Sequence, residues 1–263
     1  MRLAGIVVAN ILEAVRAAAR PGITTGELDE LARTMIADAG AVSSFLGYVP
    51  YPGMPPFPAV TCISVNDEIV HGIPGGRVLA AGDLVSVDFG VSVNGWHADS
   101  AVTFGVGQLA PDRFALCETT RRAMWDGVAA ARVGARIGDI SAAVESSVRA
   151  STTRYGIISE YTGHGIGRAM HQPPDVPNVG RAGRGELIVK GLCIAIEPMV
   201  TLGSAATVVL DDDWTVVSRD GSAAAHWEHT VAILPEGLWV LTAADGGEAE
   251  LLARGARFAP LAG

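Results

Sequence analysis

The chain has few charged residues, and acidic residues outnumber basic ones. Charged residues make up 18% of the 263 residues and hydrophobic residues 49%. This apolar content is too high for a disordered chain or a coiled coil, and it predicts a packed globular core. Nineteen Lys and Arg against 28 Asp and Glu give a formal net charge of -9, which excludes a broad basic surface for nucleic acid or anionic lipid. The acidic excess suits the binding of cations instead.

The sequence also lacks long apolar runs and paired cysteines. No stretch of about eighteen apolar residues occurs, and the alanine-rich segment around Arg16 and Arg20 has neither a cleavage site nor the apolar centre of a signal peptide. Cys62, Cys117 and Cys193 are odd in number and far apart, as expected of reduced thiols. We therefore expect a soluble protein of the cytoplasm.

The periodicity of apolar residues predicts two helices followed by strands, and then the same order again. The first helix ends at Pro21-Gly22, and Thr24 with Glu27 has the spacing of a capping box that begins the second. The segment from Gly47 to Pro58 carries five prolines and predicts a rigid loop. The predicted helices span 3–19, 24–39, 111–132 and 138–155, and the predicted strands span 59–65, 84–93, 96–104, 157–162, 192–200, 206–210 and 226–234.

The two halves of the chain share glycine positions. Gly22 and Gly26 recur at an offset of 112 as Gly134 and Gly138. This match favours two related halves, about 1–105 and 106–263, although any helix–turn–helix connection uses glycine. No linker or shift in composition separates them. We expect one domain over 1–263, with a shared sheet covered by four helices.

A hairpin brings two aspartates to one face of the predicted sheet. Asn94-Gly95 lies between two β-prone runs, a pattern typical of a two-residue type I′ turn. Pairing across that turn places Asp88 and Asp99 as diagonal neighbours roughly 7–8 Å apart, close enough to converge on a pair of metal ions. A solvated acidic face is the alternative, but Asp88 interrupts a valine-rich run that is typical of a buried strand, where a carboxylate needs a partner. His97 shares this face at its mouth, where we expect it either to support the ligands from behind or to lie at the polar rim.

Three more segments supply potential metal ligands. His164 lies among glycines in Gly-His-Gly-Ile-Gly, which we expect to give a substrate close access to the backbone, and Glu197 precedes Pro198 at the end of an apolar strand. Glu228 begins another strand, on which His229 alternates to the opposite face. Each residue alone is weak evidence. Together with the aspartates they form an oxygen and nitrogen donor set suited to Mn, Fe, Co or Zn, and four carboxylates balance two divalent ions.

Two histidines are not needed as ligands. His71 lies in Val-His-Gly-Ile-Pro, and His171 follows His164 by seven residues. Each is free to donate a hydrogen bond to a substrate, or alternatively to stabilise its own loop.

In these motifs the chain resembles the type I methionine aminopeptidases, a group of pita-bread metallopeptidases, from about residue 1 to about residue 242. The resemblance implies an α+β pita-bread fold: a curved antiparallel sheet with a pseudo-twofold axis, covered by two pairs of helices. It also implies two divalent metal ions. Asp88 would bind the first metal, His164 and Glu197 the second, and Asp99 and Glu228 would bridge them.

The resemblance further implies removal of the initiator methionine from nascent proteins that have a small second residue. Water would attack the first peptide bond, Glu197 would relay its proton, and His171 would stabilise the oxyanion. His71 would contact the scissile amide or the next residue. The implied methionine pocket consists of Phe57, Cys62, Met170 and Trp214. The chain departs from the family pattern at four positions near these motifs, which leaves the shape of the pocket open: Val70, Met170, Gln172 and His226.

Two rival functions follow from the same motifs. An Xaa-Pro aminopeptidase uses the same ligand types, but that group generally carries an additional N-terminal domain for which 263 residues leave no room. A non-catalytic relative that binds protein or RNA would be expected to have lost ligands. The expected partners are nascent polypeptide N-termini, with association to the ribosome left open. We expect a monomer that recognises neither nucleic acid nor membranes.

Overall fold

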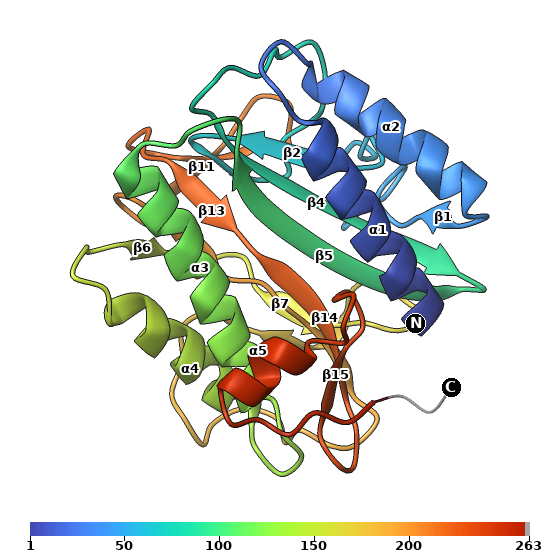
Figure 1. Ribbon diagram of the computed structural model, residues 1–263, viewed down its shortest axis with the longest axis vertical. Coiled ribbons are helices and arrows are strands. Elements are labelled where there is room, and N and C mark those ends of the chain that lie inside the picture. The colour runs from blue at the N-terminus through green and yellow to red at the C-terminus, as the bar shows by residue number, and fades with distance from the viewer. Residues whose placement is uncertain (261–263) are drawn as a thin grey trace.

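The computed structural model describes residues 1–260 and contains a curved antiparallel sheet with helices packed against it (Figure 1). The helices are α1 Arg2–Ala18, α2 Thr25–Asp38, α3 Pro111–Ala130, α4 Ile137–Arg149 and α5 Glu248–Ala253. The strands are β1 Val42–Ser43, β2 Cys62–Val65, β3 Glu68–Val70, β4 Leu84–Val93, β5 Trp96–Gly105, β6 Gly156–Ile157, β7 Gly163–Gly165, β8 Gln172–Val176, β9 Cys193–Ile196, β10 Met199–Thr201, β11 Thr207–Val209, β12 Val216–Ser218, β13 Ala224–His226, β14 Glu228–Ile233 and β15 Leu238–Val240.

The four predicted helices are confirmed. The capping box forms, because Thr24 Oγ1 accepts a hydrogen bond from the Glu27 amide at 3.1 Å and the Glu27 carboxylate accepts one from the Thr24 amide at 2.8 Å. The fourth helix ends at Arg149, six residues before its predicted end at Tyr155.

The strand prediction over 157–162 is wrong beyond Ile157. The chain makes one more backbone hydrogen bond, from Ile158 to Met199, and then leaves the sheet to line a cavity with Tyr161. Strand β8 was not predicted because Pro173 and Pro174 interrupt it. The fold accommodates them because β8 is an edge strand, where a missing donor costs no ladder hydrogen bond.

One nine-stranded sheet joins the two halves of the chain. Its order is β1-β4-β5-β14-β9-β7-β8, with β2 also paired to β4 and β15 to β14. The pairing of β5 with β14 is the seam between strands of the first and second halves. Two three-stranded sheets, β13-β10-β6 and β11-β12-β3, complete the fold.

The hairpin register is the predicted one. Val93 pairs with Trp96 across a turn in which Asn94 and Gly95 have φ angles of 52° and 72°, as a type I′ turn requires. Asp88 therefore lies opposite Ala101.

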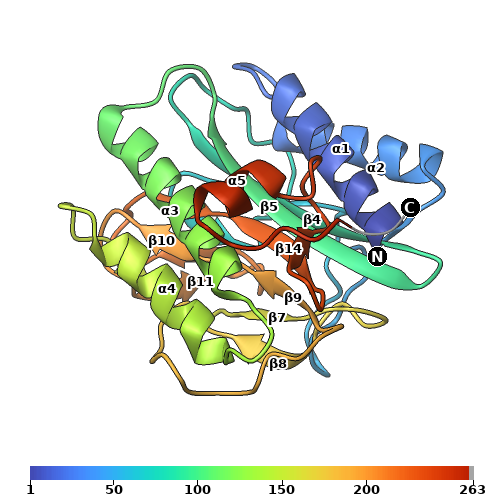
Figure 2. The ribbon, with the colours of Figure 1, turned by 60° about the horizontal axis from the view of Figure 1, so that its bottom comes forward.

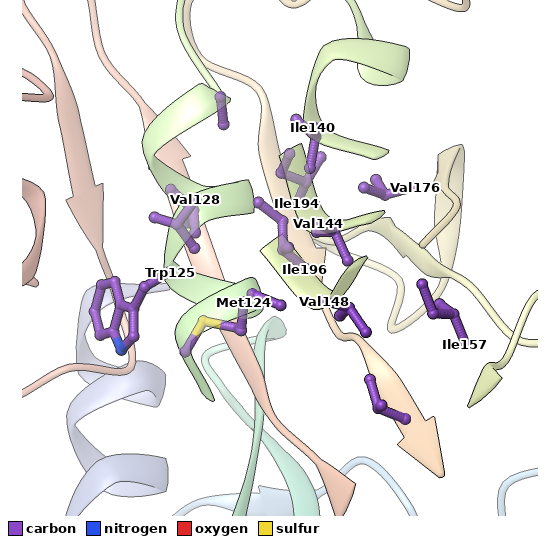
Figure 3. Close-up of a cluster of buried hydrophobic side chains, with 14 of the residues drawn as sticks. Met124, Trp125, Val128, Ile140, Val144, Val148, Ile157, Val176, Ile194 and Ile196 are labelled. Atoms are coloured by element: carbon purple, nitrogen blue, oxygen red, sulfur yellow. The ribbon is translucent and has the colours of Figure 1, made fainter. Parts of the chain in front are cut away.

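Two helix pairs cover the sheet. Helix α1 lies over β4 and β5 with α2 packed beside it, and α3 and α4 lie over the strands of the second half (Figures 1 and 2). Figure 3 shows Met124 and Val128 of α3 and Val144 of α4 directed toward Ile194 and Ile196 of β9. Burying each such side chain contributes about 1.5–3 kcal/mol, so the apolar faces of both helix pairs hold the sheet in place. Within residues 1–260, no helix has the length and apolar character needed to span a membrane.

A buried carboxylate fastens α2 to the start of the sheet. Asp29 Oδ1 accepts hydrogen bonds from the Val60 amide at 3.0 Å, the Thr61 amide at 2.9 Å and the Thr61 hydroxyl at 2.7 Å. These bonds fix the segment that leads from the proline-rich loop into β2.

We predict that Asp29→Ala lowers the free energy of unfolding by about 2–4 kcal/mol, because it leaves buried amides without an acceptor. Asp29→Asn keeps an acceptor oxygen and should cost less, and Glu30→Ala, at an exposed neighbouring position, should cost little. Urea unfolding measures all three. If Asp29→Ala is as stable as Glu30→Ala, the hydrogen bonds to the Asp29 carboxylate do not stabilise the fold.

Candidate active site

Strand pairing places the acidic residues on one face of the sheet. Cys62 pairs with Asp88, Asp88 with Ala101, and Ala101 with Glu228. Side chains at directly paired positions point to the same face, and Asp99 shares that face because it lies two residues from Ala101. Three strands thus present three carboxylates side by side.

His164 and Glu197 complete the group from β7 and the end of β9. His164 Nε2 lies 3.6 Å from Glu197 Oε1 and 3.9 Å from Asp99 Oδ2. The other ring nitrogen, Nδ1, donates to the Gly165 carbonyl at 2.9 Å, so the neutral ring carries a lone pair on Nε2. That lone pair faces carboxylate oxygens, and a cation between them would turn the repulsion into attraction.

The glycines beside His164 serve strand packing. A Cβ atom at Gly163 would lie 2.3 Å from the Ala195 carbonyl oxygen, and one at Gly165 would lie 2.2 Å from that of Pro173. The expectation that they give a substrate access to the backbone is therefore wrong, because neighbouring strands fill the space. These close contacts hold β7, and with it His164, firmly between β8 and β9.

Without a bound cation, the buried carboxyls of the site hold their protons strongly. Burial raises the pKa of Asp99 to about 7, and burial together with neighbouring carboxylates raises the pKa values of Asp88, Glu197 and Glu228 well above their ordinary range. Among residues 1–260, Asp88 Oδ1, Asp99 Oδ1 and Glu228 Oε1 are buried without a hydrogen-bond partner. Ligand atoms of Asp99, His164 and Glu228 lie within 4.8 Å of one another. This donor set fits divalent metal ions.

A cavity of about 750 Å³ opens beside these residues. The Phe57 and Trp214 rings meet edge to face at 5.0 Å, and Trp214 Nε1 donates to the Pro55 carbonyl at 3.1 Å. The proline-rich loop, which the sequence predicted to be rigid, therefore forms one wall of the cavity. All residues predicted to contact the substrate line the cavity: Phe57, Cys62, His71, Met170, His171 and Trp214.

The two additional histidines contribute neutral rings. Burial lowers the pKa values of both His71 and His171 to about 4. His71 has a left-handed backbone (φ 61°), an uncommon conformation for a residue other than glycine, and its ring contacts Tyr161 edge to face at 5.6 Å. The His171 ring lies 4.3 Å from that of His164. Both rings can donate a hydrogen bond near neutral pH without adding charge to the site.

Sequence analysis missed several residues of the site. Tyr48, Tyr161 and Met199 also line the cavity, and His226 Nε2 lies 3.6 Å from Glu197 Oε2. For Met199 and Tyr161 the sequence signal was proximity to the motifs, since Met199 directly follows Glu-Pro and Tyr161 directly precedes Thr-Gly-His-Gly. Tyr48 lies outside the motifs. His97 Nδ1 lies 2.7 Å from the Ser44 hydroxyl.

The family model of metallopeptidase family M24 matches residues 1–235. The chain belongs to this family. The methionine aminopeptidase 1 of Mycobacterium tuberculosis is 52% identical to this M24 chain over 247 residues, which cover 92% of this chain and 91% of the relative. The crystal structure of methionine aminopeptidase from Thermotoga maritima has a TM-score of 0.87 at 37% identity and covers 92% of this chain and 94% of its own. The pita-bread fold is thereby confirmed.

The fold of this M24 metallopeptidase is also found in an X-Pro aminopeptidase from Thermotoga maritima. That structure has a TM-score of 0.70 at 17% identity, and the match covers 92% of this chain but 59% of the other. The likeness concerns the fold alone.

The buried carboxyls of the M24 site make the stability of the metal-free enzyme fall as pH rises. Their folded pKa values are raised, so the stabilisation they give is complete below the unfolded values near pH 4 and is lost as pH rises through the folded values. The histidines act oppositely, because their folded pKa values are lowered to about 3 or 4. Above about pH 7.5 the histidines are almost entirely neutral in both states, so the carboxyls dominate the slope there.

We therefore predict that the metal-free enzyme loses stability as pH rises above about 7.5. A saturating divalent ion should abolish this loss, because it takes the place of the protons. Urea unfolding with and without chelator checks both statements. Asp88→Asn should weaken the pH dependence and the exposed Asp38→Asn should leave it unchanged; a flat profile in the metal-free parent contradicts the assignment.

Proposed function

We propose that this metallopeptidase hydrolyses the first peptide bond of nascent chains and releases their N-terminal methionine. One observation carries the proposal: a five-residue donor set opens directly into a cavity walled by sulfur and aromatic groups. Sulfur and aromatic side chains suit the unbranched, polarisable side chain of methionine. The metal-binding residues are proposed to be Asp88, Asp99, His164, Glu197 and Glu228.

The donor set is proposed to hold two divalent ions, chosen among Co, Mn, Fe and Zn, because four carboxylates balance two doubly charged ions. When bound, such ions supply Lewis acidity, which polarises a carbonyl group and lowers the pKa of water. Asp88 would serve the first ion and His164 with Glu197 the second. Asp99 and Glu228 would contact both.

The remaining chemistry belongs to side chains in the cavity. Glu197 would accept a proton from the attacking water on a carboxylate oxygen and deliver it to the departing amine. His171 would donate a hydrogen bond to the developing oxyanion, and His71 would contact the scissile amide. Phe57 and Trp214 would hold the methionine side chain away from water.

The proposed substrates are nascent N-termini, which the enzyme would meet in the cytoplasm as they leave the ribosome. One chain supplies every residue of the proposed site, so we propose that a monomer of one catalytic domain is sufficient. The joined nine-stranded sheet supports this organisation, because the ligands come from both halves. The rival Xaa-Pro reaction requires a site for proline at the second position and gives no role to the apolar cavity that suits methionine.

We predict that Glu197→Gln lowers the turnover of Met-Ala-Ser by at least a hundredfold, because the amide can neither relay a proton nor balance metal charge. The exposed Glu186→Gln provides the matched control. Peptide hydrolysis and metal content of the purified proteins are measured together, and Ala-Pro peptides test the rival reaction. The proposed role of Glu197 is contradicted if the Glu197→Gln variant has ordinary thermal stability and retains activity within about threefold of the parent.

We further predict that kcat/KM for Met-Arg-Ser is about ten- to two-hundredfold lower than for Met-Ala-Ser. His71 and Tyr161 are in contact beside the candidate metal site, and in the proposed function they would crowd the position after the scissile bond. A long second side chain has to displace them, at a cost of about 1–3 kcal/mol. Equal kcat/KM values for the two peptides mean that this position is open.

A further inference from the structure

The proline-rich loop has a closed neck formed by two aromatic residues. The Gly47 amide donates to the Phe57 carbonyl at 2.8 Å, and the Phe57 amide donates to the Tyr48 carbonyl at 2.9 Å. The residues between Tyr48 and Phe57 form an excursion beyond this neck. The backbone position of Tyr48 is therefore fixed by the same bonds that fix Phe57, a wall of the cavity.

The side chain of Tyr48 reaches across the cavity to His171. Its hydroxyl oxygen lies 2.6 Å from His171 Nδ1, and the two ring centroids are 5.1 Å apart. The His164 ring contacts His171 as well, at 4.3 Å between centroids. The His171 ring is thus held between a phenol and a second imidazole.

We propose that Tyr48 is a positioning residue that fixes the tautomer of His171. The Tyr48 hydroxyl donates to Nδ1, so the neutral imidazole carries its single hydrogen on Nε2. Among residues 1–260, Nδ1 is the hydrogen-bond partner of this hydroxyl, so the phenol has no protein acceptor other than Nδ1 for its hydrogen. The inference rests on the role proposed above for His171.

The direction of this hydrogen bond decides what His171 offers a substrate. With hydrogen on Nε2, the ring can donate to an oxygen that gains negative charge during the reaction. With the reverse tautomer, Nε2 would present a lone pair to that oxygen and repel it. Tyr48 acts in this way without contacting the reacting atoms.

The decisive variant is Tyr48→Phe, which keeps the ring and removes the hydrogen bond. We expect kcat for Met-Ala-Ser to fall about ten- to a hundredfold while KM stays within about twofold, because substrate binding does not require the hydroxyl. Tyr155→Phe, which removes a phenol from the core beneath α3 and α4, is the matched control and should leave kcat unchanged. Thermal unfolding verifies that both variants fold.

Nitrogen chemical shifts of histidine in the zinc-loaded enzyme report the tautomer directly. The parent should show His171 with hydrogen on Nε2, and Tyr48→Phe should show a mixture of tautomers. A parent ring with hydrogen on Nδ1 overturns the proposal, as does a variant with unchanged shifts. This measurement needs no turnover, so it remains decisive even if the parent fails to cleave methionine peptides and the proposed function falls.

A double-mutant cycle separates action through His171 from a general structural role. If Tyr48 acts through His171, adding Tyr48→Phe to His171→Ala should lower kcat by less than about twofold more. An additive loss, or a loss confined to KM, means that Tyr48 only shapes the cavity wall and contradicts the proposal.

Discussion

The central constraint in this molecule is the burial of four carboxylates within a few ångströms of one another. Carboxylates that are buried close together either take up protons or require a counter-ion. The raised pKa values of Asp88, Glu197 and Glu228 show that these carboxyls take up protons when no counter-ion is bound. Protein cations do not meet it, because among residues 1–260 the ion pairs of this cluster involve only histidines. The site is therefore built for divalent metal, and the surrounding fold holds together side chains that repel one another in its absence.

Each half of the chain supplies and supports part of this carboxylate cluster. The first half supplies Asp88 and Asp99 on a hairpin, and the second supplies His164, Glu197 and Glu228 on or beside strands that end at the cavity. The seam between β5 and β14 brings the two groups into one row. Each half has its own apolar core beneath its own helix pair, so the packing of both cores opposes the repulsion at the seam.

Local chemistry explains which features could be predicted from sequence. The hairpin register followed from Asn94-Gly95 and period-two alternation. The proposed ligands were candidates because Asp88 interrupts an apolar run and because Glu197 and Glu228 lie at the ends of apolar strands. The long-range features could not be predicted in this way. Tyr48 lies 123 positions from His171, and only the tertiary fold brings them together. Likewise, the purpose of Gly163 and Gly165 depends on strands that arrive from elsewhere in the chain.

The register of the sheet also links selectivity to chemistry. Cys62 lies directly opposite Asp88 on the neighbouring strand, and adjacent strands are about 4.8 Å apart, so the apolar pocket begins one strand away from the first carboxylate. Burial and the charge of Asp88 raise the pKa of the Cys62 thiol well above its ordinary value, and the thiol stays neutral as a wall of the pocket. In the proposed function, a side chain seated against Cys62 would therefore bring its own carbonyl group close to the carboxylate cluster. A residue too short to reach this wall would gain no such placement, so the strand pairing that assembles the cluster would also select the substrate.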